Sequence, residues 1–231
     1  MKSILPSETR LLPQPTLGDQ AYVRLSGLLI SGRIAPGERL SIRDLATTFE
    51  VSMTPVREAV SRLAATGALE VTRNRAATVP LMNVQRFRDI TRVRIQIEGF
   101  AAAEAARLRD AATLAEIEAA ERAFRKLQGA RPHEMAKAVQ LNQEFHFAVY
   151  AAATSPTLFE IIRTLWLQVG PILNLDLREN PERLEQGEAV GCHQTAVAAI
   201  KNGDTDCARE AIARDIASAA AFIEGQGKLS E

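Results

Sequence analysis

The chain has 231 residues, of which 46% are hydrophobic and 24% are charged, and its formal net charge at pH 7 is zero. This is the composition of an ordinary soluble globular protein, and the long runs rich in Ala, Leu, Ile, Glu and Arg favour helices over strands. No apolar run approaches the roughly 18 residues that cross a bilayer, and the N-terminus lacks the apolar core of a signal peptide. These features exclude a membrane-spanning protein and predict a cytoplasmic one.

The charge is divided unevenly along the chain. Residues 1–80 carry 10 Lys/Arg and 7 Asp/Glu, whereas residues 81–231 carry 18 and 21. A basic N-terminal part joined to a mildly acidic remainder is compatible with a protein that contacts phosphate at one end only. The two cysteines, Cys192 and Cys207, are expected to be free thiols, as is usual in the cytoplasm.

The first elements are an arm and a helix. Residues 1–18 hold three prolines among polar residues and are expected to form a flexible N-terminal arm. A helix is predicted over about Gln20–Ser31, with Asp19 as its N-cap and Gly32 as its stop.

A short helix, a tight turn and a second helix follow. Ser41 is placed to cap a helix that ends at Phe49, and Ser52 or Thr54 to cap the next one. Pro55 suits the first turn of that second helix, because its missing N–H would be unpaired there in any case. Two short strands, Leu69–Thr72 and Ala77–Val79, complete the unit, so residues 19–80 are predicted to form a winged helix-turn-helix.

The rest of the chain is helical almost throughout, with short connections typical of an antiparallel bundle. The fold class is therefore mainly α: an N-terminal winged helix-turn-helix and a C-terminal all-α antiparallel helical bundle over residues 81–231. The predicted helices are Val84–Leu108, Thr113–Gln128, Glu134–Ala152, Pro156–Leu177 with a break at Pro171, Pro181–Asn202 and Thr205–Ile223.

Polar side chains gather around the second helix of the winged unit. Thr54 and Arg57 share one face of that helix, Arg43 opens the helix before it, and Arg73 and Arg75 lie at the wing tip. Arginine can donate two hydrogen bonds to guanine, and helix N-termini with Ser or Thr side chains contact phosphates. Each arginine alone would be an ordinary solvated side chain, but the set predicts that the helix enters the major groove of double-stranded DNA.

The pattern PG-x-x-L…LA…VS-x-TPVREA…L…G resembles that of GntR-type transcription regulators, and the helical remainder resembles the FCD effector domain of their FadR subfamily. The resemblance covers about residues 20–225. It implies DNA contacts at six positions: Arg43, Ser52, Thr54, Arg57, Arg73 and Asn74. This chain departs from the family at Met53, where the family usually has Arg. Methionine cannot donate to guanine but can lie against a thymine methyl group, so an altered operator is expected.

Four polar residues of the helical part fall on apolar helix faces: Asn142, His146, His193 and Asp215. Such groups need partners inside the bundle. One arrangement is a divalent metal held by two imidazoles and a carboxylate, as in many Zn, Fe, Mn or Ni sites. The alternative is that each histidine bonds to a neighbouring helix and Asp215 pairs with an arginine.

The resemblance favours the metal. Metal-binding FCD domains have a D-x-x-x-H pattern and two further histidines on the last two helices. This chain has Asn142 in place of the Asp and Asp215 in place of the last His, so that two imidazoles and one carboxylate remain. In the same family an arginine at the position of Arg94 binds a carboxylate of the effector, although Arg94 can also pair with Glu98 one turn on. Tyr150 and Trp166 give no functional signal beyond a role in the core or at the surface.

The sequence thus predicts a ligand-responsive transcriptional regulator, usually a repressor, that binds a pseudo-palindromic operator as a homodimer. By resemblance, the effector is a small carboxylate metabolite bound in the dimerising FCD domain. One alternative is a regulator that senses an acyl thioester without metal. Another is a metal-dependent enzyme, but no nucleophile–base pair is visible and enzymatic activity is not expected.

Overall fold

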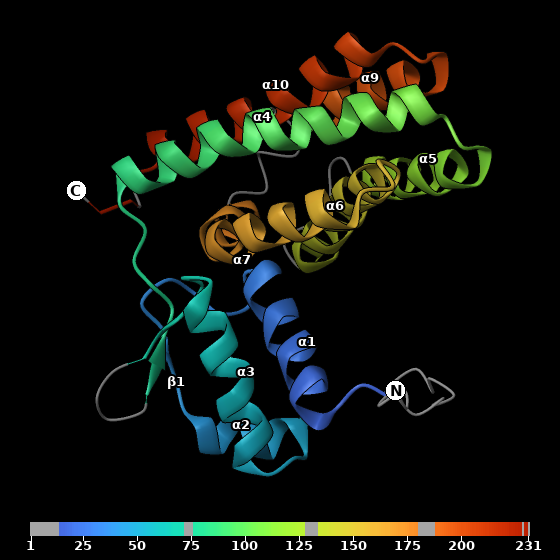
Figure 1. Cartoon of the computed structure of the whole chain (residues 1–231). Helices are drawn as coiled ribbons and strands as arrows, with labels where there is room; N and C mark the ends of the chain where they lie inside the picture. The colour runs from blue at the N-terminus through green and yellow to red at the C-terminus, as the bar shows by residue number, and fades with distance from the viewer. Residues whose placement is uncertain (1–13, 72–75, 128–133, 180–187, 228, 231) are drawn as a thin grey trace, which may run out of the picture.

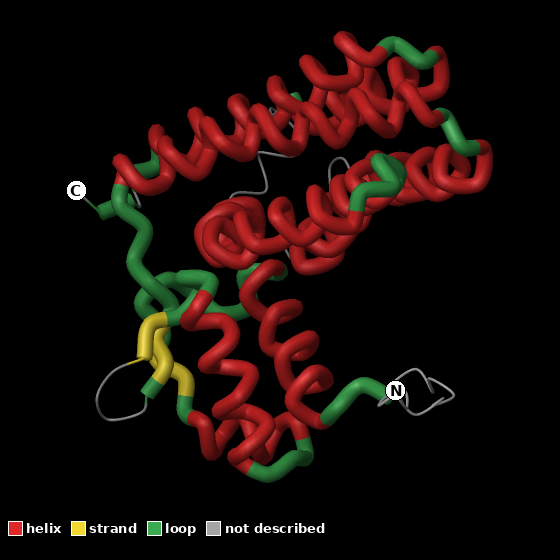
Figure 2. The backbone as a smooth tube through the Cα atoms, in the orientation of Figure 1, coloured by secondary structure: helices red, strands yellow, loops and turns green. Residues whose placement is uncertain are grey.

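A computed structural model describes residues 14–71, 76–127, 134–179, 188–227, 229 and 230. These residues are mainly helical, as predicted, with one small sheet in the N-terminal part (Figures 1 and 2). The N-terminal part, called the head, contains α1 (Leu17–Ile30), β1 (Arg39–Leu40), α2 (Ile42–Phe49), α3 (Met53–Ala65), β2 (Glu70–Val71) and β3 (Ala77–Thr78). The helical domain contains α4 (Val84–Leu108), α5 (Ala111–Arg125), α6 (Met135–Ala151), α7 (Pro156–Glu179), α9 (Ala189–Asn202) and α10 (Thr205–Gly225).

Helix α1 begins three residues earlier than predicted. Its N-cap is Thr16, whose Oγ1 accepts a hydrogen bond from the backbone N–H of Asp19 at 3.1 Å, while Asp19 Oδ2 accepts from the backbone N–H of Thr16 at 3.1 Å. This reciprocal pair is a capping box, so the assignment of Asp19 as the N-cap was wrong and Asp19 is its third-residue partner. The helix therefore enters the segment predicted to be the arm, of which residues 1–13 lie outside the described residues.

The head has the three helices and the hairpin that the sequence predicts. Its sheet has the order β1-β3-β2 with both pairs antiparallel, and Thr78 lies between Arg39 and Glu70. Strand β1 was not predicted, because two residues are too few to show the alternation of a strand. The predicted wing-tip residues Arg73, Asn74 and Arg75 lie outside the described part of the chain.

The helical domain has two layers. Helices α4, α9 and α10 form one layer and α5, α6 and α7 the other, with the head below α7 (Figure 1). Helix α10 lies along α4, and Gly99 allows their close approach, since a Cβ there would lie 3.0 Å from Cγ and 3.3 Å from the carbonyl oxygen of Arg209. The buried polar residues of the helical domain described below lie between these layers.

Two helix predictions need correction. Helix α7 continues through Pro171 without the predicted break. Proline removes one backbone donor, but the flanking residues of α7 are buried against both domains, and this packing keeps the helix intact. Helix α9 begins at Ala189 rather than Pro181, and residues 180–187 lie outside the described residues. No helix in the described part of the chain is long and apolar enough to cross a membrane.

Candidate functional site

The first turn of α3 lies at the end of the head farthest from the helical domain (Figure 1). Ser52, Met53, Thr54 and Arg57 are all exposed there, and 45% of the surface of Met53 is accessible. Ser52 is the N-cap of α3, as predicted, although its hydroxyl makes no capping hydrogen bond. The hydroxyl and the first N–H groups of α3 are therefore turned toward solvent, where an anion could reach them.

Burial of the opposite face determines which side of α3 is exposed. Val56, Ala59, Val60 and Leu63 are buried in the head, in the helical spacing that the sequence predicts. The outward face carries Arg57 beside a groove of about 340 Å³, whose lining is Ile42, Arg57, Val60, Ser61, Ala64 and Val71. Arg43 is also exposed, at the start of α2. The described DNA-contact candidates are thus all accessible to solvent.

The three predicted metal ligands with ionisable side chains meet between the layers of the helical domain. His146 on α6 has Nε2 3.1 Å from Oδ2 of Asp215 on α10, and Nε2 of His193 on α9 lies 3.7 Å from the same oxygen. One ligand atom from each lies within 4.8 Å of the others, and all three residues are buried. Neighbouring ligands of a tetrahedral ion with bonds of about 2.1 Å lie about 3.4 Å apart, so these separations suit a shared ion.

The environment of His193 differs from that of an ordinary hydrogen-bonded core residue. Its ring is fully buried, stacked on Phe145 at 3.9 Å between centroids, and neither ring nitrogen has a hydrogen-bond partner among the described residues. Buried polar groups in proteins are nearly always paired, so the unpaired ring nitrogens of His193 indicate a further binding partner. Burial, which outweighs the nearby Asp215, also lowers the pKa of His193, and the neutral imidazole is the form that binds metals.

The carboxylate of Asp215, beside the two histidines, remains charged. Burial alone would raise the pKa of Asp215, but the two nearby imidazoles of His146 and His193 outweigh it and hold the pKa well below its ordinary value. The donor set is therefore two imidazoles and one carboxylate, which fits Zn²⁺, Mn²⁺, Ni²⁺ or Fe²⁺.

Arg94 is buried, as its inward spacing predicts, and it pairs with Glu98. Its Nε lies 2.6 Å from Oε1 and its Nη2 3.2 Å from Oε2 of that carboxylate, and its guanidinium lies 5.0 Å from the ring centroid of Trp166. Tyr150 donates its hydroxyl hydrogen to Oε2 of Glu98, and its oxygen lies 3.0 Å from Nδ1 of His146. We call this series of hydrogen-bonded side chains, Arg94–Glu98–Tyr150–His146, the buried relay.

Sequence reasoning missed Tyr150, to which it assigned no functional role. The available signal was its spacing, because Tyr150 follows His146 by four residues and so lies on the same face of α6. Burial explains why the phenol stays protonated: together with the charge of Glu98, it raises the pKa of Tyr150 well above the usual value, against a smaller opposing effect of Arg94.

Arg94, Asn142, His146 and Asp215 line one small cavity. Its volume is about 20 Å³, and Trp166, Leu173 and Leu177 of α7 form part of its wall. A cavity of about 10–15 Å³ holds one water, whereas pockets for small organic ligands measure about 300–1,000 Å³. In this conformation the cavity suits an ion or a water, and a metabolite would have to displace its walls.

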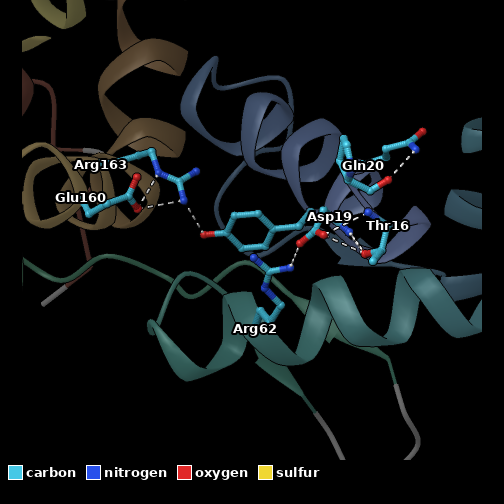
Figure 3. Close-up of polar contacts among 8 residues, drawn as sticks. Thr16, Asp19, Gln20, Arg62, Glu160 and Arg163 are labelled. Carbon is cyan, nitrogen blue, oxygen red and sulfur yellow. Dashed lines mark hydrogen bonds and ion pairs between the residues drawn. The ribbon is translucent and has the colours of Figure 1, made fainter. Parts of the chain in front are cut away.

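On the side of α7 away from the cavity, the helix packs against the head. Arg163 of α7 donates to the hydroxyl of Tyr22 of α1 at 3.2 Å and pairs with Glu160 at 3.1 Å. The guanidinium of Arg62 of α3 lies 4.1 Å from the ring centroid of Tyr22, and Arg62 pairs with Asp19 at 2.8 Å. Figure 3 shows the two arginines approaching from α3 and α7.

Closer backbone contact occurs about two to three turns further along α7. Asn174, which is fully buried, donates through its side-chain amide to the carbonyl of Ile30, the last residue of α1. At Gly170 a Cβ would lie 2.8 Å from Cα and 2.9 Å from the carbonyl oxygen of Ile30. Gln168 donates to the carbonyl of Thr66, just after α3, at 3.0 Å. We call these contacts, with Arg163–Tyr22, the α7 interface, which was not predicted from the amino-acid pattern.

A winged helix-turn-helix head joined to a helical domain with a buried polar cavity defines the class of ligand-responsive DNA-binding regulators. Comparison with protein families agrees: residues 17–79 match the gntR family of bacterial regulatory proteins, and residues 89–218 match the FCD domain. The chain belongs to the gntR family, in the FadR-type subfamily that carries an FCD domain, as the sequence resemblance implied.

Individual relatives support this assignment. The HTH-type transcriptional regulator McbR of Escherichia coli K12 is 33% identical over 183 residues, which cover 79% of this chain and 81% of McbR. The solved structure of E. coli McbR/YncC matches with a TM-score of 0.82 at 28% identity over 93% of this chain and 100% of that one. The HTH-type transcriptional repressor RspR of E. coli K12 is 33% identical over 99 residues, 43% of each chain. A GntR regulator from Rhodococcus sp. RHA1 has a TM-score of 0.70 at 21% identity over 90% of this chain and 97% of that one, a likeness of fold alone.

Proposed function

We propose that this protein is a repressor that binds a pseudo-palindromic operator as a homodimer and releases it when a small carboxylate metabolite enters the helical domain. The observation that carries the proposal is the buried cluster His146–His193–Asp215, which lies one helix away from the DNA-binding head. Two heads in one dimer suit two half-sites, because linkage raises the affinity of a small contact surface.

We further propose that the cluster holds a divalent metal. His146, His193 and Asp215 would be its ligands, with the amide oxygen of Asn142, which lines the same cavity, as a weaker neutral one. The metal would supply positive charge for a carboxylate effector, and Arg94 lines the cavity beside it. Two of the three guanidinium nitrogens of Arg94 bond to Glu98, so the effector would meet the third.

The small cavity also supports the coupling of ligand to DNA. A metabolite larger than a water must move the walls of a 20 Å³ cavity, and α7 forms one of these walls. Because α7 contacts α1 and the end of α3 through the α7 interface, its displacement would shift the head. Ligand would then favour an arrangement of the two heads that does not match the operator. A long acyl thioester would have to displace these walls much further than a small carboxylate would.

Substitution of Gly170 tests this coupling. Gly170→Ala would place a methyl group within 3 Å of the backbone of Ile30, so α1 and α7 must separate. We expect the free energy of unfolding to fall by about 1–3 kcal/mol, as for other overpacked contacts, and operator affinity without ligand to change. Urea unfolding and DNA binding measure the two effects.

Gly27→Ala is the matched control for Gly170→Ala. Gly27 is exposed on α1, and a Cβ there would meet no atom within 4 Å. This substitution should leave operator binding unchanged and stabilise the helix by up to about 1 kcal/mol. Equal behaviour of the two variants would contradict the α7 interface as the coupling element.

Met53 is expected to alter base preference. It is exposed in the first turn of α3 beside Thr54, and its thioether side chain can contact a thymine methyl but cannot donate to guanine. Met53→Arg should change the preferred base at one position of each half-site, by about 1–3 kcal/mol of discrimination. Binding to a set of single-base operator variants measures this, and an unchanged preference would rule the contact out.

The proposal as a whole is tested with purified protein. Selection from genomic DNA fragments should yield a site with two inverted half-sites, and small organic acids can then be screened for thermal stabilisation with and without added metal, since a ligand that binds the native state raises the melting temperature. A stabilising acid should weaken binding to the selected site. If it binds equally well with and without that DNA, the proposed release mechanism is wrong.

A further inference from the structure

The hydrogen bonds around Tyr150 determine which nitrogen of His146 carries a proton. Glu98 is fully buried and its carboxylate is held by the guanidinium of Arg94 through two hydrogen bonds. Arginine can only donate, and a carboxylate paired with it has no proton to offer. The short contact between Tyr150 and Oε2 of Glu98 must therefore use the hydroxyl hydrogen of Tyr150.

The phenol of Tyr150 has a single hydrogen to donate. Because Tyr150 directs it at Glu98, the phenol oxygen can only accept from its other neighbour, Nδ1 of His146 at 3.0 Å. Nδ1 must then carry a proton. The other nitrogen, Nε2, points to Asp215 and lies with His193 in the metal-ligand cluster.

We infer that Glu98 and Tyr150 are positioning residues that keep Nδ1 of His146 protonated and thereby present Nε2 to a divalent metal. Arg94 contributes by holding Glu98 in place. Hydrogen bonds of this kind, in which a ligating histidine donates its other N–H, fix the orientation of the ring and raise its basicity. This inference rests on the metal site of the proposed function and assigns the ligating atom.

Unlike His146, His193 is not oriented by hydrogen bonds. Its two ring nitrogens have no hydrogen-bond partner among the described residues, so its orientation is set by packing against Phe145 and Phe124. His146 is thus the histidine whose ligating atom is determined by hydrogen bonding.

Zinc binding to the full chain tests the inference. Tyr150→Phe removes only the hydroxyl and should weaken zinc binding by about 10- to 100-fold in competition with a chelator. Tyr22→Phe is the matched control, because Tyr22 is the other tyrosine of the chain and its hydroxyl bonds to Arg163 in the α7 interface. The control should bind zinc as the wild type does.

A spectroscopic measurement separates positioning from general stability. In the zinc-loaded wild type, ¹⁵N NMR of labelled histidine should show His146 protonated at Nδ1 and coordinated through Nε2. Coordination through Nδ1, or wild-type affinity in Tyr150→Phe, would overturn the inference while the metal site stands. No zinc binding by the wild-type chain would overturn the metal site and this inference together.

Discussion

Arg57→Ala should lower the affinity for the operator by about 30-fold to 20,000-fold. Arg57 is exposed on the outward face of α3, beside the groove between this helix and the wing strands. A lost bidentate contact to a base costs about 1–3 kcal/mol, and a homodimer loses it in both half-sites. Fluorescence anisotropy at a fixed salt concentration measures the change, since the phosphate contribution varies steeply with salt.

Arg92→Ala is the control for a lost surface charge. Arg92 is exposed on α4 and pairs with Asp89 on the same helix at 2.6 Å, on the other domain from the DNA-binding surface. Its removal should change operator affinity little. Full operator binding by Arg57→Ala would show that the first turn of α3 does not contact bases.

Addition of Zn²⁺ to chelator-treated protein should raise its melting temperature by about 5–10 °C. A ligand at about 100 times its dissociation constant stabilises the native state by about 2.7 kcal/mol, and a chain of this size gains about 2–4 °C for each kcal/mol. The expected cause is the neutralisation of the buried Asp215 and the pairing of His193, whose ring nitrogens have no hydrogen bond among the described residues. Differential scanning calorimetry measures the shift.

Two substitutions on α10 test whether the zinc-induced rise in melting temperature depends on Asp215. Asp215→Asn keeps the shape of the side chain but removes the charged ligand, and it should abolish most of the zinc-induced shift. Asp206→Asn removes a carboxylate from the exposed first turn of the same helix and should preserve the shift. If elemental analysis finds no stoichiometric metal in the wild type after loading, and the melting temperature is unchanged, the metal site is refuted.

Much of the fold was predictable because it depends on neighbours in the sequence. Caps and helix stops act over three or four residues, so the helix from Val84 to Leu108 was predicted with its observed bounds. The helical spacing of apolar residues placed Arg94, His146, His193 and Asp215 on inward faces, and all four are buried. The error at Asp19 has the same origin, because Thr16 and Asp19 can each cap a helix.

The amino-acid sequence alone determined the order of the helices, the exposed first turn of α3 and the family to which the chain belongs, since all of these are encoded by local patterns. Tertiary structure decided the rest. Glu98 meets Tyr150 across 52 residues and Ile30 meets Asn174 across 144, and no helical or strand period connects residues so far apart. Packing also kept α7 continuous through Pro171. The buried relay and the α7 interface therefore arise only when the two layers and the head assemble, because each contact requires the backbone positions that the others create.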